Sequence, residues 1–270
     1  MIPDIESVTR ILEEVAAEEV LPRFQMLKDH EVRRKAGGEL VTVADVAAEE
    51  QISRRLADLL PGSHVVGEEA TADDPSVLDR LASEDDWVWV IDPVDGTGNF
   101  ARGKPAFAVM AGLVRGGETV AGWIHHPVEG RTATAEVGAG AWLGGERLRV
   151  ADDAPLGQMR GTLHAGTFAP PDMVRQVQAR RARVGAIKSL RCAGLEYLRL
   201  ASGQMHFSLF TKLMPWDHVP GALIQREAGG LARTLDGAPY TARSHRAPGL
   251  LLAPGEAAWR VLHDALFGPE

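Results

Sequence analysis

The chain has 270 residues and a formal net charge of −8, with 45% hydrophobic and 24% charged residues. This balance is typical of a globular protein and excludes extended disorder, and the acidic excess argues against binding to a nucleic-acid backbone. The single cysteine, Cys192, excludes an intramolecular disulfide. The first residues do not resemble a signal peptide, and the apolar runs are shorter than the ~20 residues of a membrane span, so we expect a cytoplasmic protein with no membrane segment.

The first half of the chain is expected to form two helices followed by an antiparallel sheet. Apolar residues recur at helical spacing over 5–20, with Asp4 as the cap, and a second helix is expected after Asp45, ending at Pro61. The alternation of apolar residues and the turn residues between them predict strands at 64–66, 87–91, 106–114, 119–125, 132–137 and 140–143.

The second half alternates between strand and helix patterns. Strands are expected near 161–164, 205–210 and 249–253, and helices near 172–183, 193–202 and 217–228. We therefore expect an N-terminal α+β layer over residues 1–148 and a C-terminal α/β layer over 149–270. The two would pack as a single compact unit with a shared cleft.

An acidic loop follows the buried strand at 87–91. Asp92 and Asp95 lie three residues apart, and Pro93 stiffens the turn between them so that both carboxylates can converge on a hard cation. The Val94 carbonyl can supply a further oxygen ligand.

The residues that follow suit an anion. Gly96, Thr97 and Gly98 leave backbone N–H groups open, which is the arrangement that cradles phosphate oxygens. The alternative interpretation of this segment is a plain Asp-Gly turn after a strand, so other segments must decide between them.

Two further segments carry carboxylates at the end of a strand or the start of a helix. Glu68 and Glu69 follow the strand at 64–66, and Asp217 begins the helix at 217–228, where simple N-capping is the alternative role. Three such groups are what a site for two or three metal ions needs. A haloacid-dehalogenase-type phosphatase would need a nucleophilic Asp where Pro93 stands, which favours attack by water over a covalent route.

These blocks resemble the inositol monophosphatase family, within the larger group that includes fructose-1,6-bisphosphatases and bisphosphate nucleotidases. The blocks are Val41-Thr42-Val43-Ala44-Asp45, Gly67-Glu68-Glu69, Trp89 to Thr97 with Asn99-Phe100, and Trp216-Asp217 leading into Glu227-Ala228-Gly229-Gly230. The resemblance implies an α/β protein with the layered α-β-α-β-α sandwich of that family, acting as a homodimer on a small phosphorylated metabolite.

The resemblance also implies a set of ligands for two or three Mg²⁺ ions. Glu68, Asp92 and the Val94 carbonyl would hold the first ion, and Asp92, Asp95 and Asp217 would hold the second. A third ion would bind near Glu68 through water.

The same resemblance implies the catalytic groups. Thr97, hydrogen-bonded to Asp45, would orient and help deprotonate the nucleophilic water, with Glu68 beside them. Lys35 is expected to approach the same edge of the site.

The sequence departs from the family pattern on the substrate side. Phe210 stands where inositol-preferring relatives have a Glu that binds sugar hydroxyls, and we expect it either to stack on a substrate ring or to pack in its strand. Arg191 replaces the usual Gly and would contact a second anionic group, with an exposed structural arginine as the alternative. Gly166 and Thr167 resemble another substrate-side loop.

Two tempting residues are interpreted as structural. His125 and His126 are adjacent on a strand and point to opposite faces, so at most one could face any site.

Three alternatives to an inositol-phosphate substrate stay open. Within the same class, the substrate could be a nucleoside 3′,5′-bisphosphate or histidinol phosphate. Outside it, the chain could be a non-catalytic binding or regulatory homologue, although a pure binder has no need of the pair Thr97 and Asp45.

Overall fold

The computed structural model describes residues 2–35, 38–166 and 169–269. Its α-helices are α1 (Ile5–Val15), α2 (Val43–Leu59), α3 (Glu68–Asp73), α4 (Thr97–Phe100), α5 (Pro171–Arg180), α6 (Ala193–Ala201), α7 (Pro215–Glu227) and α8 (Glu256–Phe267). None of the helices within these ranges is both long enough and apolar enough to cross a membrane.

The larger sheet has seven strands and lies in the first half of the chain. In spatial order they are β3 (His64–Gly67), β4 (Trp87–Asp95), β5 (Ala108–Arg115), β6 (Glu118–His126), β7 (Arg131–Glu136), β8 (Gly140–Leu143) and β9 (Glu146–Arg147). The expected hairpin is confirmed: Gly116 and Gly117 both have positive φ, as a tight turn between β5 and β6 requires. The expectation of a wholly antiparallel sheet is wrong at one edge, because β3 pairs with β4 in parallel.

The smaller sheet has five strands, in the order β11 (Gly185–Ala186), β10 (Arg160–His164), β12 (Phe207–Phe210), β14 (Leu250–Ala253) and β13 (Leu231–Thr234). β10 runs parallel to β11 and β12, whereas β14 is antiparallel to β12 and β13. The expected order ended at the strand near 249–253 and was incomplete. The chain continues into α8, and β13 precedes β14.

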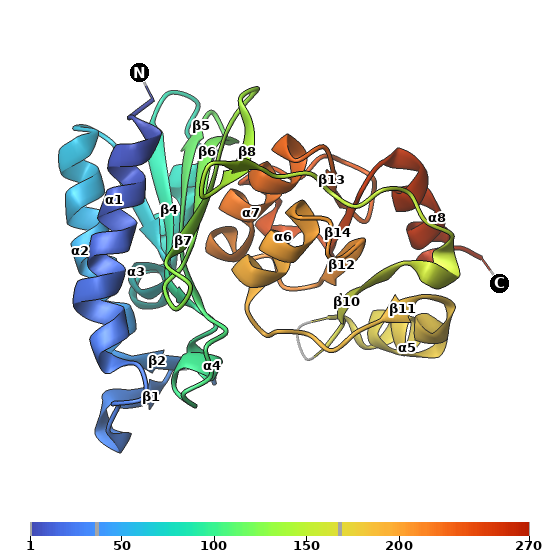
Figure 1. The fold of residues 1–270 in the computed structure, drawn as a ribbon, viewed down its shortest axis with the longest axis horizontal. Helices are drawn as coiled ribbons and strands as arrows, with labels where there is room; N and C mark the ends of the chain where they lie inside the picture. The colour runs from blue at the N-terminus through green and yellow to red at the C-terminus, as the bar shows by residue number, and fades with distance from the viewer. Residues whose placement is uncertain (1, 36–37, 167–168, 270) are drawn as a thin grey trace.

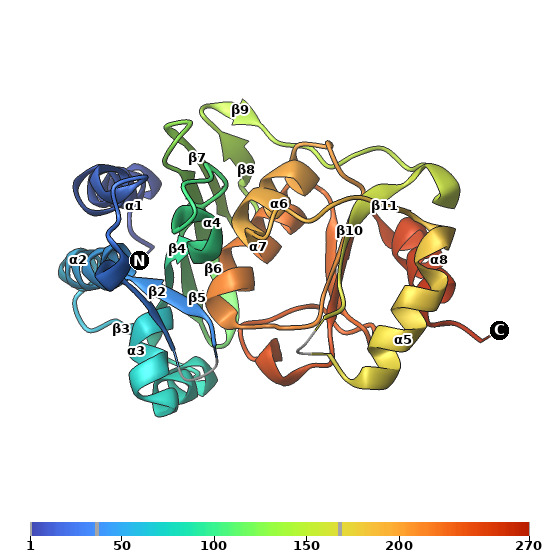
Figure 2. The same cartoon turned by 90° about the horizontal axis from the view of Figure 1, so that it is seen from below.

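The two sheets and the helices form alternating layers (Figures 1 and 2). α1 and α2 cover the outer face of the seven-stranded sheet, α6 and α7 lie between the sheets, and α5 and α8 cover the outer side of the five-stranded sheet. This confirms the α-β-α-β-α sandwich. Three clusters of buried apolar side chains fill the spaces between successive layers.

The first helix has the predicted cap. Asp4 accepts a hydrogen bond from the Ser7 amide at 3.0 Å, and α1 buries Val8, Leu12 and Val15 against the sheet. The helical path continues through a wider turn, Ala16–Val20, and a short 3-10 turn, Leu21–Arg23.

The second helix begins earlier than expected. Thr42 caps α2 and Asp45 is its third residue, where the Asp45 carboxylate accepts a hydrogen bond from the Thr42 amide at 2.8 Å. This reciprocal capping box places Asp45 inside the helix and not ahead of it. A short antiparallel pair, β1 (Val32–Arg34) and β2 (Leu40–Thr42), leads into the helix.

Helix α7 lies unusually close to the seven-stranded sheet. A Cβ on Gly122 would sit 2.9 Å from the Pro220 carbonyl oxygen, and a Cβ on Gly112 would overlap the Val219 side chain. Only glycine permits this approach, which brings the first turn of α7 to the end of β4. The candidate site lies at that junction.

Candidate active site

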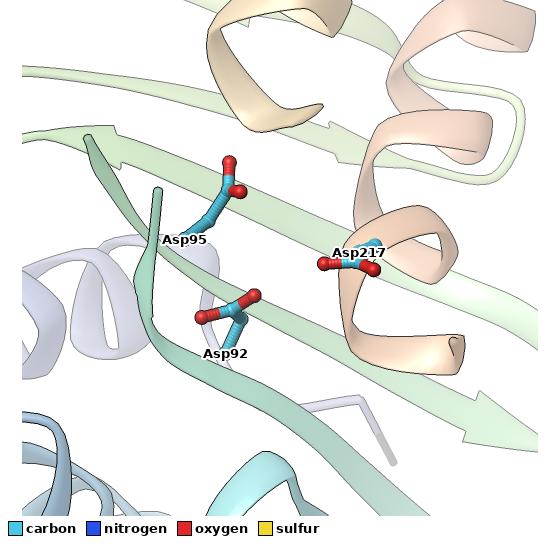
Figure 3. Close-up of side chains that lie close together, drawn as sticks. All are labelled: Asp92, Asp95 and Asp217. Carbon is cyan, nitrogen blue, oxygen red and sulfur yellow. The ribbon is translucent and has the colours of Figure 1, made fainter. Parts of the chain in front are cut away.

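Three carboxylates converge where β4 ends and α7 begins. Asp92 and Asp95 belong to the last residues of β4, and Asp217 lies in the first turn of α7. Each of them offers one oxygen, and these oxygens all lie within 4.8 Å of one another. Figure 3 shows the three side chains directed toward a common space. This spacing suits carboxylates that bridge hard cations.

The three carboxylates of this triad place negative charges close together in a poorly solvated site. Burial, reinforced by the neighbouring carboxylates, raises the pKa of Asp92 well above its usual range. Burial and then the Asp95 charge do the same to the pKa of Asp217. Because ionised carboxylates in such a place repel one another, bound cations would stabilise the arrangement, so the residues present fit a metal site.

Asp95 is fixed by the start of α6. Its two carboxylate oxygens accept hydrogen bonds from the Ala193 amide at 3.1 Å and the Gly194 amide at 2.6 Å, and the Cys192 thiol donates a third at 3.0 Å. Burial raises the pKa of Asp95, and these three bonds oppose that rise. The contacts orient Asp95 before any ion binds.

Glu68 lies beside the triad but is not part of it. It is the first residue of α3, directly after β3, and it lines the same cleft as Asp92, Asp217 and Thr97. Lys35 reaches this edge of the site, as expected: its Nζ lies 2.7 Å from Glu68 Oε1 and 2.8 Å from Glu69 Oε1.

Glu49, which was not predicted from the sequence, positions the segment that carries Glu68. Glu49 of α2 is 5% exposed, and its carboxylate accepts hydrogen bonds from the amides of Glu69 and Ala70, both at 2.8 Å. It therefore caps the first turn of α3. A signal was available: Glu49 shares its helix face with Asp45 and Ile52, and a carboxylate in a buried stripe is unusual.

Thr97 and Asp45 form the predicted pair. Thr97 Oγ1 lies 3.0 Å from Asp45 Oδ1 and also 3.0 Å from the Val94 carbonyl oxygen. Burial raises the pKa of Asp45 to about 7, although the hydrogen bond from the Thr42 side chain opposes the rise. A carboxylate with this pKa can exchange a proton near neutrality, as a general base requires.

A comparison with known families decides the relationship. The profile of the inositol monophosphatase family matches residues 4–266. The chain belongs to the inositol monophosphatase family. Members of this family are metal-dependent phosphatases, so the chain is a phosphoric monoester hydrolase.

Individual relatives agree with this family assignment. The chain is 33% identical over 252 residues to the inositol-1-monophosphatase of Mesorhizobium japonicum. That alignment covers 91% of this chain and 90% of the relative. It is 30% identical over 207 residues to a fructose-1,6-bisphosphatase/inositol-1-monophosphatase of Thermotoga maritima, 76% of each chain. Among solved structures, the extragenic suppressor protein suhB from Bartonella henselae is similar with a TM-score of 0.80 and 26% identity, over 97% of this chain and 99% of that one.

A cavity of about 560 Å³ adjoins the acidic centre of this family member. It shares Asp95, Asp217, Glu39 and Lys212 with the cleft that holds the triad, so the two spaces are neighbours. Its far wall includes His164, Gly166, Arg191 and Phe210. Thr167, expected beside Gly166, lies outside the described residues.

Phe210 packs within the protein. Its ring stacks on His164 with centroids 4.7 Å apart and on Tyr197 with centroids 5.8 Å apart, and the residue is 5% exposed. With two rings stacked on it and so little of the residue exposed, Phe210 offers little surface on which a ligand ring could stack. Of the two expectations for Phe210, the structure favours packing in its strand.

The remaining expectations on this side concern Arg191 and the two histidines. Arg191 is exposed, lines the cavity and has a positive φ of 56°. His125 Nδ1 is 2.9 Å from Thr132 Oγ1, and His126 Nε2 is 3.0 Å from the Pro105 carbonyl oxygen. Both histidines are buried with protein partners away from the acidic centre, which agrees with a structural role.

Proposed function

We propose that this chain is a Mg²⁺-dependent phosphomonoesterase that hydrolyses a small phosphorylated metabolite by direct attack of water. The observation that carries the proposal is the triad of Asp92 and Asp95, which are buried, and Asp217, which is half-buried. Their carboxylates lie close together in a cleft that adjoins a substrate-sized cavity. When bound, Mg²⁺ supplies neutralising charge for the phosphate and lowers the pKa of a water molecule.

The ligands for two or three ions come from the triad and its neighbours. Glu68, Asp92, Val94, Asp95 and Asp217 all line one cleft. As the family resemblance implies, Glu68, Asp92 and the Val94 carbonyl would hold one ion, and Asp92, Asp95 and Asp217 would hold the second. The ion pair with Lys35 involves Glu68 Oε1, which leaves the second carboxylate oxygen for a cation.

Thr97 and Asp45 would handle the proton of the attacking water. The Thr97 hydroxyl donates toward Asp45 Oδ1, so a lone pair of Oγ1 is left to accept a hydrogen bond from the water. As the water attacks phosphorus, its proton passes through the hydroxyl to Asp45. The alkoxide of the departing alcohol then takes a proton from solvent.

The loop after Asp95 would hold the phosphate. Gly96 adopts a left-handed conformation with φ of 87°, and Thr97 opens the short helix α4. Amides at this point have no acceptor within the helix. The N–H groups of Gly96, Thr97 and Gly98 are therefore available for phosphate oxygens, as the sequence predicts.

A substrate panel tests this function. Phosphate release is measured from inositol 1-phosphate, adenosine 3′,5′-bisphosphate, histidinol phosphate and fructose 1,6-bisphosphate, with Mg²⁺ and with EDTA. We expect Mg²⁺-dependent phosphate release from at least one of these compounds. The compound that the enzyme hydrolyses most efficiently identifies the substrate class. No release from any compound with Mg²⁺ present would favour the non-catalytic alternative.

We also propose that the enzyme is a homodimer, because the family resemblance implies one. Light scattering on the purified protein should give twice the chain mass of 29.0 kDa. A mass that stays at one chain over the accessible concentration range would contradict this.

A further inference from the structure

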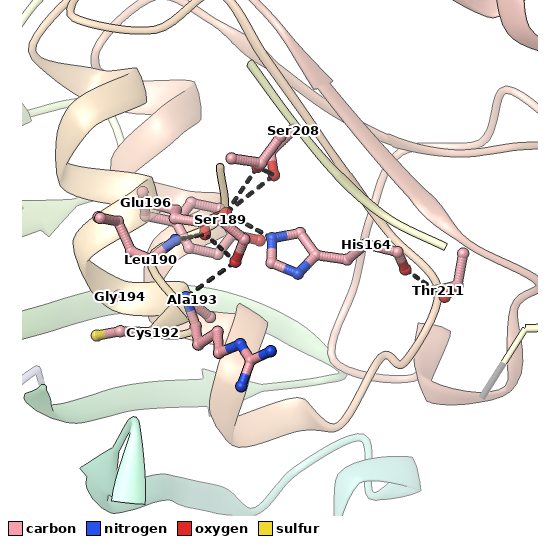
Figure 4. A network of polar contacts seen from close by, with 12 residues as sticks. His164, Ser189, Leu190, Cys192, Ala193, Gly194, Glu196, Ser208 and Thr211 are labelled. Atoms are coloured by element: carbon pink, nitrogen blue, oxygen red, sulfur yellow. Dashed lines mark hydrogen bonds and ion pairs between the residues drawn. The ribbon is translucent and has the colours of Figure 1, made fainter. Parts of the chain in front are cut away.

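A buried carboxylate on the substrate side of the cavity has no role in the mechanism above. Glu196 of α6 is fully buried, and it was not predicted from the sequence. Its Oε2 accepts hydrogen bonds from Thr162 Oγ1 at 2.7 Å and His164 Nε2 at 2.6 Å, and its Oε1 accepts from Ser189 Oγ and the Leu190 amide, both at 2.8 Å. Figure 4 shows this network.

The partners of Glu196 keep it ionised. Burial would raise the pKa of Glu196, but the hydrogen bond and charge of His164 and the hydroxyl donors outweigh burial and lower it. A fully buried anion that is satisfied by this many donors is a fixed point around which flexible groups can be ordered.

The first group that Glu196 orders is the His164 imidazole. Nε2 donates to the carboxylate, and the ring stacks on Phe210 with an interplanar angle of 15°. The ring is thus fixed by one nitrogen and one face. Nδ1 has no hydrogen-bond partner among the described residues, and the side chain is 27% exposed in the wall of the cavity.

The second group is the loop that carries Arg191. The Arg191 amide donates to Ser189 Oγ at 2.9 Å, and Ser189 itself is held by Glu196. Asn99 Nδ2 donates to the Leu190 carbonyl at 2.8 Å from the opposite side. These bonds hold Arg191 at its φ of 56°, a left-handed backbone conformation that is unfavourable for a residue with a side chain.

The strained backbone places a cationic side chain at the cavity. Arg191 is exposed there, and no carboxylate within the described ranges forms an ion pair with its guanidinium. The Arg191 guanidinium and the Nδ1 edge of the His164 ring therefore line the same cavity as the acidic residues Asp95 and Asp217.

We infer that His164 and Arg191 form a subsite for a second anionic group of the substrate, and that Glu196 is the positioning residue that holds both. The inference rests on the proposed phosphatase function, because the first phosphate is the one bound at the acidic centre. The second group is a carboxylate or a second phosphate, since both accept hydrogen bonds from a guanidinium and from the Nδ1–H of an imidazolium, the form of His164 that binds an anion while Nε2 donates to Glu196. A neutral polyol can accept hydrogen bonds from these side chains but gains no charge attraction to the guanidinium.

Two matched pairs of substrates test the subsite in the intact enzyme with Mg²⁺. The first pair is 2-phosphoglycerate against glycerol 2-phosphate, which differ by a carboxylate. The second is fructose 1,6-bisphosphate against fructose 1-phosphate, which differ by a phosphate. We expect kcat/KM to favour the doubly anionic member of at least one pair by about 10-fold or more, and the pair that responds identifies the group.

Substitutions test whether the preference for the doubly anionic substrate depends on Arg191, His164 and Glu196. Arg191→Gly removes the guanidinium and relieves the positive φ, so it should fold well while reducing the preference ratio by about 10-fold, mainly through KM of the anionic member. His164→Gln and Glu196→Gln should also reduce the ratio through KM, and Glu196→Gln should do so although its side chain does not reach the substrate. Arg181→Gln, an exposed arginine outside the cavity, is the matched control and should leave the ratio unchanged.

The outcomes separate this inference from the proposed function. Equal kcat/KM for both members of both pairs, or a preference that survives Arg191→Gly and His164→Gln, would overturn the subsite while leaving the phosphatase intact. Absence of release from every compound would instead contradict the phosphatase activity, and the subsite would fall with it.

Discussion

Gly67 is predicted to be indispensable because of Glu49. A Cβ at position 67 would lie 2.6 Å from Glu49 Oε2 and closer still to the rest of that carboxyl group. The Glu49 carboxylate now accepts hydrogen bonds of 2.8 Å from the amides of Glu69 and Ala70, and it would have to move away from both. Hydrogen bonds to a charged group contribute about 1.5–3 kcal/mol each, so we expect Gly67→Ala to reduce the free energy of unfolding by about 3 kcal/mol or more.

The effect should reverse when Glu49 is absent. The backbone at Gly67 has φ of −101°, which alanine adopts freely, so in a Glu49→Ala background the same substitution should stabilise the protein by about 0.4–1 kcal/mol. Urea unfolding of the four proteins of this cycle, all in EDTA, measures the coupling. Gly157→Ala is the control, because a Cβ there meets nothing within 4 Å. An equal loss in both backgrounds would refute the reasoning.

Three further predictions concern the metal site, the proton pathway and acid stability. Asp92→Asn should reduce phosphate release by about 1,000-fold or more and weaken Mn²⁺ binding in equilibrium dialysis; full activity would contradict the metal assignment. Thr97→Val, which keeps the shape but removes the hydroxyl, should lower kcat by about 100- to 10,000-fold and leave Mn²⁺ binding intact, whereas unchanged kcat would exclude Thr97 from proton transfer. Burial lowers the pKa of His125 to about 4, so the unfolded chain binds more protons and stability should fall by about 3 kcal/mol as pH drops from 6.5 to 4. Urea midpoints across this range should show a shallower decline for His125→Gln, and an identical decline would contradict the assignment.

Elements of the fold were predictable where neighbouring residues in the sequence carry a clear cap, turn or hydrophobic pattern. The cap and apolar spacing of α1, the Gly116-Gly117 turn and the buried run of β4 all reflect chemistry within a few residues, and all three were found. β13 was missed because its residues, Leu-Ala-Arg-Thr, do not alternate between apolar and polar side chains. The parallel pairing of β3 was missed because it depends on a partner about twenty residues away in the chain.

Helix α8 was not predicted, although its sequence has a helical pattern. Its buried residues Ala258, Trp259, Leu262 and Leu266 recur at helical spacing, so the sequence contained the signal. The early start of α2 was equally readable, since Thr42 and Asp45 have the spacing of a capping box.

The residues of the candidate site also fall into two groups, those that a motif predicts and those that only the structure reveals. Asp92, Asp95, Asp217 and the pair Thr97 and Asp45 follow from motifs, and the structure brings the three carboxylates to one cleft. Groups that act by holding others were harder to find. Glu49 and Glu196 lie among the buried residues of their helices. The donors that surround each of them are set by tertiary packing, which no local pattern encodes.

The packing of Phe210 was also beyond the sequence. Its neighbours in the ring stack, His164 and Tyr197, come from two other elements, β10 and α6. Only the assembled layers show that these rings pack on Phe210.

The central claim is that the carboxylates at the end of β4 and the start of α7 bind the Mg²⁺ that supports phosphate-ester hydrolysis. The most direct test is phosphate release by EDTA-treated protein on adding back Mg²⁺, measured side by side for the wild type and Asp217→Asn on the best substrate of the panel. We predict full recovery of activity for the wild type and little or none for Asp217→Asn, whose fold should persist because Asp217 repels its neighbours in the metal-free protein. Release that needs no Mg²⁺, or that recovers equally in the variant, would contradict the account.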